Sequence, residues 1–501
     1  QHHRLGLSPA VHVADEEVRL ALLCDELGCT PAKARRFADR LADRKRAVSS
    51  GSPGDEELDA VLRRYDAVLR DRGMVDFDDL LVLPVTLLEA DPELAAAYRD
   101  RWSEICVDEY QDVDELQYRL LRLITRPGGN LCAIGDPDQA IYGFRGGDVG
   151  YFLRFRHDFP TARVVELTRS YRSTPTIVRA ALGAIAPATL VPGRALSVER
   201  VVADDRPITV HRAAGPREEG EAVADAIERM LGGASFWTLD RRAADGSTKP
   251  GLSFADFAVL YRTDAQSGPI ADALDRRGFP IQVRSHERLA DRPAVRAVVA
   301  ALDARRPVPS PPTGNPPAVT VAEQLDRAID VTGRPGDASR VAALAVQALL
   351  RPLADSYGTD LDRFLDDVEL WTEVDTWDPR ADRISLLTLH AAKGLEFPVV
   401  FVVGCEDGLL PFRLTPAPGA SDGDGASDAA EERRLFFVGM TRAIDRLALT
   451  SAATRHRWGA MREQPVSPFV GDIDPALVDA MTGPGHDQAR RSTASRQLRL
   501  L

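Results

Sequence analysis

Two short apolar runs, Ile105-Cys-Val107 and Leu131-Cys-Ala-Ile134, decide the fold of this 501-residue chain. The first leads directly into Asp108-Glu-Tyr-Gln-Asp112, and the second leads into Gly135-Asp-Pro-Asp-Gln139. Apolar runs that end in acidic or glycine-containing turns and alternate with helical segments are typical of buried parallel strands, whose functional groups gather at the strand ends. The pattern therefore predicts a parallel α/β sheet with chemistry at the ends of its strands.

A second set of apolar runs predicts another α/β domain later in the chain. These runs occupy residues 208–210, 257–261, 384–389 and 399–403. Apolar residues at helical spacing over residues 11–69 predict a small helical subdomain, divided by the Ser, Gly and Pro residues of segment 49–54. A proline-interrupted helical stretch, residues 293–380, predicts a second helical insertion. The Gly, Asp and Ser-rich stretch 416–427 predicts a flexible loop.

The composition is that of a soluble globular chain too long for a single core. Hydrophobic residues make up 44% and charged residues 28%, and no apolar run approaches the roughly eighteen residues that span a bilayer. The net charge of −13 argues against wrapping nucleic acid through bulk charge, although a local groove can be basic on an acidic protein. Without a signal peptide, a cytoplasmic location is expected.

The cysteines are scattered, without a CxxC pair or a matching histidine spacing. They are Cys24, Cys29, Cys106, Cys132 and Cys405. This pattern favours buried free thiols in a reducing compartment over a disulfide framework or a metal site.

Two adjacent carboxylates stand at the expected end of the first strand. Mg²⁺ prefers hard oxygen ligands, and a water that attacks a γ-phosphate needs a positioned base, so Asp108 and Glu109 suit both tasks. Acidic pairs are also common by chance in a chain with 76 acidic residues, so the functional interpretation of this pair depends on the strings that surround it. After the second strand, Gln139 can hydrogen-bond a phosphate oxygen. Tyr142 and Phe144, which taken singly would be ordinary core aromatics, offer faces on which bases stack.

Five strings in a fixed order carry a family resemblance. They are VDEYQD (107–112), GDPDQAIYGFRGG (135–147), SYRSTPTIV (170–178), TLHAAKGLEF (388–397) and EERRLFFVGMTRA (431–443). In this order they resemble motifs II to VI of the UvrD/Rep/PcrA group of superfamily 1 DNA helicases. The resemblance implies an α/β fold with two RecA-like parallel-sheet domains, the first incomplete, and helical inserted subdomains.

The resemblance also implies domain boundaries. The first RecA-like domain takes residues 1–10 and 96–165 with a helical insertion at 11–95, and the second takes residues 166–292 and 381–475 with a helical insertion at 293–380, followed by a flexible tail at 476–501.

An ATP and Mg²⁺ site between the two RecA-like domains is implied as well. By similarity, Asp108 would help hold Mg²⁺, Glu109 would activate the attacking water, and Gln139 would sense the γ-phosphate. Arg172 and Arg442 would act as arginine fingers rather than as solvated surface charges, because developing phosphoryl charge needs cations. The other implied nucleotide contacts are stacking of the adenine on Tyr171, a carboxylate facing the nucleotide from Glu396, and support of the phosphate side by Arg145.

For single-stranded DNA, the resemblance implies a path lined by stacking groups and phosphate contacts. His390 would line this path, with Thr388 and Lys393 nearby. Tyr142 and Phe144 would supply the stacking faces. Phe144 replaces the tryptophan more usual in the family, which should weaken the stacking modestly.

A phosphate-binding loop of the form GxxxxGK[ST] is absent from the 501 residues. The opening string His2-His-Arg-Leu-Gly-Leu7 resembles a family motif that follows this loop, so an N-terminally truncated helicase is expected. The chain by itself is then expected to hydrolyse ATP poorly.

The leading expectation is an ATP-dependent helicase that moves 3′ to 5′ on single-stranded DNA and at junctions with duplex, in repair or replication restart. The alternative is a DNA-binding or regulatory protein of the same fold that does not hydrolyse ATP. A nuclease subunit is disfavoured, because the segment after the last motif is too short for a nuclease domain. The terminal residues resemble a peptide that docks on a sliding clamp, with Gln497, Leu498, Leu500 and Leu501 as its anchors.

Overall fold

The computed structural model describes two compact units, Gln1–Val164 and Val165–Leu501. The described residues are 2–49, 56–200, 205–232, 251–284, 289, 292–304, 319–332, 338–370, 381–413, 422–457 and 460–481. The expected clamp-docking peptide at residues 497–501 lies outside this part of the chain, as does most of the expected break at 49–54. No helix in the described ranges is both long and apolar enough to cross a bilayer.

The first unit begins with a helical module built on α1 (Glu16–Leu27), α2 (Pro31–Ser49) and α3 (Glu56–Asp71). Its core gathers buried leucines that recur at helical spacing, among them Leu22, Leu41 and Leu62. The short strands β1 (His12–Val13) and β2 (Met74–Val75) pair in parallel beside it. The helices α4 (Asp79–Ala90) and α5 (Pro92–Arg101) follow.

A two-stranded parallel sheet carries the motif residues of the first unit. It consists of β3 (Glu104–Val107) and β4 (Asn130–Ala133), with α6 (Glu115–Ile124) between them and the short helices α7 (Gly150–Leu153) and α8 (Phe155–Asp158) after them. Val107 and Ala133 pack against the buried Tyr110 and Tyr151. The opposite face is open, and Ile134 directly after β4 is 49% exposed.

This open face corrects two expectations. The strands were predicted to be buried, but only one of their faces is covered. Cys106 and Cys132 were expected to be buried thiols, yet both are exposed because they point to the open face. Cys405 is buried, and Cys24 and Cys29 are half-buried.

The second unit is organised by a seven-stranded sheet in the order β15-β7-β12-β11-β8-β10-β9. Every neighbouring pair in it is parallel, which confirms the α/β fold class. The strands are β7 (Ile208–Ala213), β8 (Phe257–Tyr261), β9 (Ile281–Arg284), β10 (Ile384–Thr388), β11 (Phe397–Val402), β12 (Ala443–Ala452) and β15 (Val478–Met481). Because β8 and β10 are buried along their whole length, their sequences are continuous apolar runs rather than alternating ones.

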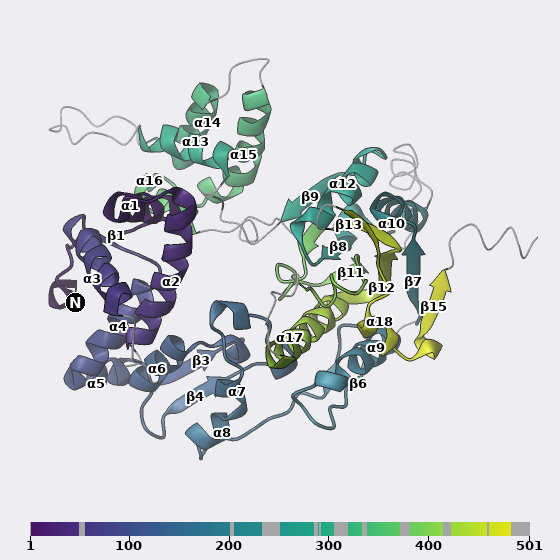
Figure 1. Cartoon of the computed structure of the whole chain (residues 1–501), viewed down its shortest axis with the longest axis horizontal. Helices are drawn as coiled ribbons and strands as arrows, with labels where there is room; N and C mark the ends of the chain where they lie inside the picture. The colour runs from purple at the N-terminus through teal and green to yellow at the C-terminus, as the bar shows by residue number, and fades with distance from the viewer. Residues whose placement is uncertain are drawn as a thin grey trace, which may run out of the picture. The chain divides into compact units, whose positions relative to one another are not determined.

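Helices cover this sheet on both sides (Figure 1). On one face, α10 (Pro216–Met230) and α12 (Ser267–Asp275) share a core with Phe257, Val259 and Tyr261. On the other side lie α9 (Pro175–Ile185) and α17 (Asp422–Met440). The short strands β5 (Arg169–Ser170) and β6 (Ser197–Val198) pair with each other. A hairpin of β13 (Thr454–Arg457) and β14 (Ala460–Glu463) follows β12, and α18 (Pro468–Gly471) precedes β15.

The inserted helices form a module with its own core. They are α13 (Pro293–Asp303), α14 (Val321–Thr332), α15 (Ala338–Ala354) and α16 (Leu361–Leu370).

Two boundaries differ from the expectations. The stretch predicted as a flexible loop at 416–427 contains the start of α17, which begins at Asp422. The stretch predicted as a flexible tail contains β15, whose backbone pairs with the edge strand β7.

Candidate functional site

The turn after β3 places Asp108 and Glu109 on the surface of the first unit. Glu109 has φ 51°, which makes it the one non-glycine residue of positive φ in the described ranges. The Asp108 carboxylate accepts the backbone N–H of Glu109 at 2.9 Å and so stabilises this turn. Backbone conformations of this kind cost free energy and are concentrated at functional sites. The two exposed carboxylates therefore stand at a sharp bend directly after the strand.

A buried amide joins this turn to the turn after β4. Gln111, which is 1% exposed, donates from Nε2 to the Glu109 carboxylate. Its Oε1 accepts the backbone N–H of Asp136 at 3.0 Å. Gly135 leaves room for this contact, because a Cβ there would lie 2.3 Å from Gln111 Oε1. Gln111 was missed as a functional residue in the sequence, although it lies inside the VDEYQD string.

The turn after β4 holds Gln139 beside Asp136, whose backbone N–H donates to Gln111. Gln139 donates from Nε2 to the Asp136 carboxylate at 3.0 Å, and Asp136 also accepts the N–H of Asp138 at 3.1 Å. The structure thus brings Asp108, Glu109 and Gln139 to neighbouring turns, with Asp136 and Gln111 between them.

An aromatic cluster follows in the same unit. The rings of Tyr142 and Phe144 are 6.2 Å apart, and Phe144 is 66% exposed. The Arg145 guanidinium lies over both rings, 5.7 Å and 5.5 Å from their centroids. Burial raises the pKa of Tyr142, so its phenol stays neutral at physiological pH. The three residues together present flat aromatic surface and positive charge.

In the second unit, the starts of β11 and β12 bring together three predicted nucleotide-site residues, Arg172, Glu396 and Arg442. Arg172 Nε donates to Glu396 Oε2 at 2.5 Å. The Arg442 carbonyl accepts the N–H of Phe397 at 2.9 Å, which joins the two strand starts. Arg442 is 3% exposed, and its guanidinium donates to the carbonyls of Val438 and Leu395 at 3.0 Å and 3.3 Å. Its charge is therefore directed into its own unit.

Arg200 supports the chain at these strand starts and was also missed in the sequence. Its guanidinium donates to the carbonyls of Arg172 and Ile444 at 3.1 Å and 2.8 Å, and to the Asp445 carboxylate at 2.5 Å. The neighbouring Tyr171 ring is 63% exposed, with the Arg169 guanidinium 5.9 Å from its centroid.

The residues expected to contact DNA in this unit lie at the other ends of the strands. Thr388 closes β10, and its Oγ1 accepts the N–H of Ala391 at 3.1 Å. The Lys393 N–H donates to the His390 carbonyl at 3.2 Å. Thr388 is buried, whereas His390 and Lys393 are half-buried. Thr388 therefore shapes the turn that carries the other two.

Sequence comparisons assign this arrangement to a family. The UvrD/REP helicase N-terminal domain matches residues 24–160. The UvrD-like helicase C-terminal domain matches residues 165–306 and 345–454, about half of the chain. The chain belongs to the UvrD-like helicase family.

Curated relatives of this UvrD-like chain are similar over most of its length. ATP-dependent DNA helicase PcrA of Leuconostoc citreum is 27% identical, over 91% of this chain and 68% of its own length. DNA helicase II of Escherichia coli is 28% identical, over 95% and 75%. ATP-dependent DNA helicase UvrD1 of Mycobacterium tuberculosis is 29% identical, over 84% and 64%.

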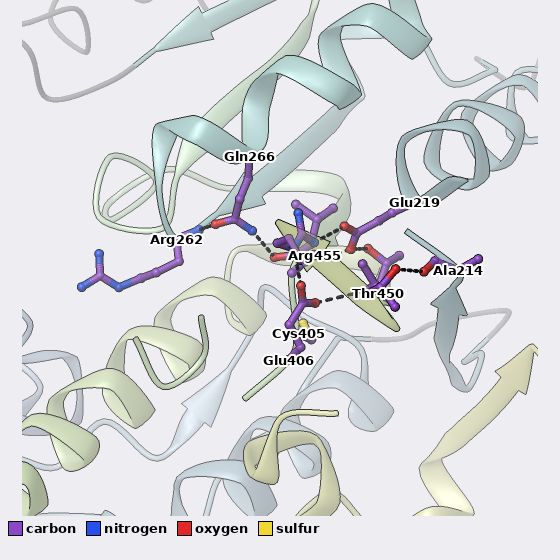
Figure 2. A network of polar contacts seen from close by, with 12 residues as sticks. Ala214, Glu219, Arg262, Gln266, Cys405, Glu406, Thr450 and Arg455 are labelled. Carbon is purple, nitrogen blue, oxygen red and sulfur yellow. Dashed lines mark hydrogen bonds and ion pairs between the residues drawn. The ribbon is translucent and has the colours of Figure 1, made fainter. Parts of the chain in front are cut away.

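The UvrD-like second unit also holds a buried ion network at the carboxyl ends of its strands (Figure 2). Arg455 of β13 donates to Glu219 of α10 at 2.6 Å and also to Glu406, which follows β11. Glu219 accepts the Thr450 hydroxyl at 2.7 Å and the Gly404 N–H at 2.9 Å. Both carboxylates are at most 2% exposed. Burial raises the pKa of Glu406, which Arg455 opposes.

Proposed function

We propose that this UvrD-like chain is the motor of an ATP-dependent DNA helicase that moves 3′ to 5′ on single-stranded DNA, in repair or replication restart. One observation carries the proposal: the Gln111 amide connects the Glu109 carboxylate with the Asp136 backbone. A base and a phosphate-sensing turn held in one unit are what a hydrolytic motor needs. The names of the relatives, ATP-dependent DNA helicases, support the same assignment.

Asp108 is the proposed Mg²⁺ ligand. In the described ranges, no group of three or more His, Cys, Asp or Glu side chains could hold a metal ion by itself. This fits Mg²⁺, which is commonly held by one or two carboxylates together with the phosphates of its nucleotide. Bound Mg²⁺ would neutralise phosphate charge. Glu109 would take the proton of the attacking water, while Gln111 orients its carboxylate.

Arg172 and Arg442 of the second unit are the proposed cations for nucleotide phosphates. The ion pair with Glu396 orients Arg172, and a preorganised guanidinium stabilises a developing phosphoryl charge without reorganisation during the reaction. Arg442, which donates to the carbonyls of Val438 and Leu395, would have to leave them to reach a phosphate. The exposed Tyr171 ring would stack on the adenine.

Each unit carries groups proposed to contact single-stranded DNA. Tyr142 and Phe144 provide stacking faces for bases. Arg145, which lies over both rings, would support the phosphate side of the nucleotide. His390 and Lys393 would contact the strand from the turn that Thr388 closes.

The substitution Glu109→Gln tests the assignment in the full-length gene product. We expect DNA-stimulated ATP hydrolysis to fall by at least about 100-fold, because a general base typically contributes this much or more. Nucleotide binding should change by less than about twofold, since the amide keeps the size of the carboxylate. Glu104→Gln, at the exposed opposite end of β3, is the matched control and should hydrolyse ATP normally.

Retained turnover in Glu109→Gln would overturn the assignment of the base. Wild-type protein that binds DNA but never hydrolyses ATP would indicate the alternative, a regulatory protein with the helicase fold.

A further inference from the structure

The end of α1 brings two cysteines into contact. The C-cap residue Gly28 has a left-handed φ of 57°, and Cys24 lies one turn before it. The Cys24 carbonyl accepts the N–H of Gly28 and, at 3.3 Å, the N–H of Cys29. Helix ends in which the residue after the glycine makes this hydrogen bond commonly place its side chain against the residue five positions earlier. The contact between Cys24 and Cys29 is therefore set within one short stretch of consecutive residues.

The surroundings of the two thiols support this contact. Both are half-buried and pack against the core that α1, α2 and α3 share. Partial burial raises the pKa of Cys24, and so do the charge of Cys29 and a hydrogen bond between the two thiols. Cys24 therefore keeps its proton beside Cys29. Because the thiolate is the nucleophile, Cys29 is the sulfur that should react first.

We propose that Cys24 and Cys29 form a reversible thiol–disulfide site that a hydroperoxide such as hydrogen peroxide closes. The Cys29 thiolate attacks one peroxide oxygen, the O–O bond breaks, and the departing hydroxide takes up the proton that Cys29 had released. The Cys24 sulfur then attacks the sulfenic sulfur of Cys29, so that the S–S bond forms and the S–O bond breaks. The second hydroxide leaves as water with the proton of Cys24. The two thiols lose two electrons, which reduce one peroxide to two waters.

Closure would act at the corner between α1 and α2. Cys24 lies in the last turn of α1, and Cys29 lies two positions before Pro31, where α2 begins. The intervening Thr30 accepts the Lys33 N–H at 2.9 Å in the first turn of α2. A covalent link between the two cysteines would therefore hold the end of one helix to the start of the next. The site would make the opening of this corner sensitive to peroxide.

The test uses the 501-residue chain without nucleotide or DNA, so its outcome does not depend on the proposed helicase function. The chain is treated with hydrogen peroxide, the remaining thiols are alkylated, and tryptic peptides are analysed by mass spectrometry. Trypsin cuts after Arg19 and Lys33, so both cysteines lie in one peptide, residues 20–33. We expect this peptide to lose two hydrogens and to escape alkylation, and we expect a reducing agent to restore both thiols.

Substitutions separate a link from independent oxidation of the two thiols. Cys24→Ser should leave a sulfenic acid on Cys29, and dimedone should label it at least about tenfold more than in the wild type, where Cys24 consumes it. Gly28→Ala should slow formation of the link at least about threefold, because a left-handed φ is costly for alanine. Gly28→Asn is its matched control and should close almost as fast as the wild type, since asparagine tolerates this φ. Cys405→Ser removes a distant buried thiol and should leave closure unchanged.

Hydrogen exchange provides a second measurement on unsubstituted protein. Oxidation should slow exchange of the Cys29 amide, which donates to the Cys24 carbonyl, at least about tenfold. Wild-type protein in which Cys29 is oxidised to a sulfenic or sulfinic acid while Cys24 stays a free thiol would overturn the proposal. So would a peptide 20–33 that stays reduced, or a link from either cysteine to another part of the chain.

Discussion

At the scale of single residues, Gln111 determines how the two motif turns of the first unit meet. Removing a buried amide costs about 1–3 kcal/mol, because the backbone N–H that donated to it remains unsatisfied. We therefore expect Gln111→Leu to lower the free energy of unfolding by about that amount. It should also lower kcat for DNA-stimulated ATP hydrolysis by about tenfold or more, since the Glu109 carboxylate loses its donor.

Urea unfolding and steady-state kinetics of the full-length protein check this prediction. Gln117→Leu is the control for kcat: the exposed Gln117 side chain accepts the Asp114 N–H in the capping box of α6, so its loss should lower stability through helix capping and leave kcat at the wild-type value. Wild-type kcat in Gln111→Leu would show that the amide does not position the base.

Gly135 gives a second prediction at this scale. An added methyl group would lie 2.3 Å from the buried Gln111 Oε1 and 2.9 Å from the half-buried Phe152 ring, so both groups must move. We expect Gly135→Ala to destabilise the chain by about 1–3 kcal/mol, the usual cost of overpacking. Gly268→Ala in α12, where nothing lies within 4 Å of the added Cβ, should leave stability equal or higher. Thermal unfolding that does not separate the two variants would contradict this account.

The sequence predicted some of these residues and not others, for a physical reason. Asp108, Glu109 and Gln139 could be proposed because the chemistry of each is visible in its own string. Gln111 could not, since its partner at Asp136 becomes a neighbour only when β3 and β4 pair. Cys106 and Cys132 also lie opposite each other only because β3 and β4 pair in this register.

At the scale of elements, a buried charge cluster holds α2, α3 and α4 together. Lys45 Nζ lies 3.0 Å from Asp66, 3.1 Å from Asp76 and 2.6 Å from Asp79. Three carboxylates thus share one ammonium. Burial and the neighbouring Asp76 raise the pKa of Asp79 to about 6.

This raised pKa predicts a pH dependence of stability. Between about pH 4 and pH 6 the folded state holds a proton on Asp79 that the unfolded state releases, so this carboxyl lowers the free energy of unfolding as pH rises. Asp79→Asn removes that titration. We expect the free energy of unfolding of Asp79→Asn, minus that of the wild type, to be on the order of 1 kcal/mol larger at pH 7.5 than at pH 5.

Urea unfolding at the two pH values checks this expectation. Asp43→Asn is the control, because Asp43 is 78% exposed in its pair with Arg46. A difference between Asp79→Asn and wild type that does not change with pH would contradict the assignment.

Element boundaries were less predictable than the elements themselves. The buried strands β8 and β10 were visible as apolar runs, because both of their faces are covered. The strand β15 was taken for tail, since its sequence is Val-Asp-Ala-Met and its pairing with β7 comes from distant residues. The start of α17 at Asp422 lies in a Gly, Asp and Ser-rich stretch whose composition favours a loop.

At the scale of the whole molecule, the parallel sheet of the second unit separates two sets of functional residues. Arg442 and Glu396 directly precede β12 and β11, whereas Thr388 ends β10. Parallel strands of about five residues place their two ends roughly 17 Å apart. The proposed nucleotide and DNA contacts of this unit therefore lie at opposite ends of the strands of one sheet.

The Arg455 network stabilises the carboxyl edge of that sheet, where α10, β12 and the segment after β11 meet (Figure 2). Arg455→Met would leave Glu219 and Glu406 buried without their shared cation. Removing one partner of a buried ion pair costs about 3–5 kcal/mol, so we expect a loss of this size at pH 7.5. Part of it should return near pH 5, because protonation of a carboxyl with a raised pKa removes the buried charge.

Urea unfolding of three variants separates this charge effect from a loss of packing. Combining Arg455→Met with Glu219→Gln and Glu406→Gln should recover most of the stability, since neutral amides need no cation. Arg462→Met, an exposed arginine on β14, should change the free energy of unfolding by less than about 1 kcal/mol. If the triple variant is as unstable as Arg455→Met alone, the guanidinium acts through its packing, and the buried carboxylates do not depend on its charge.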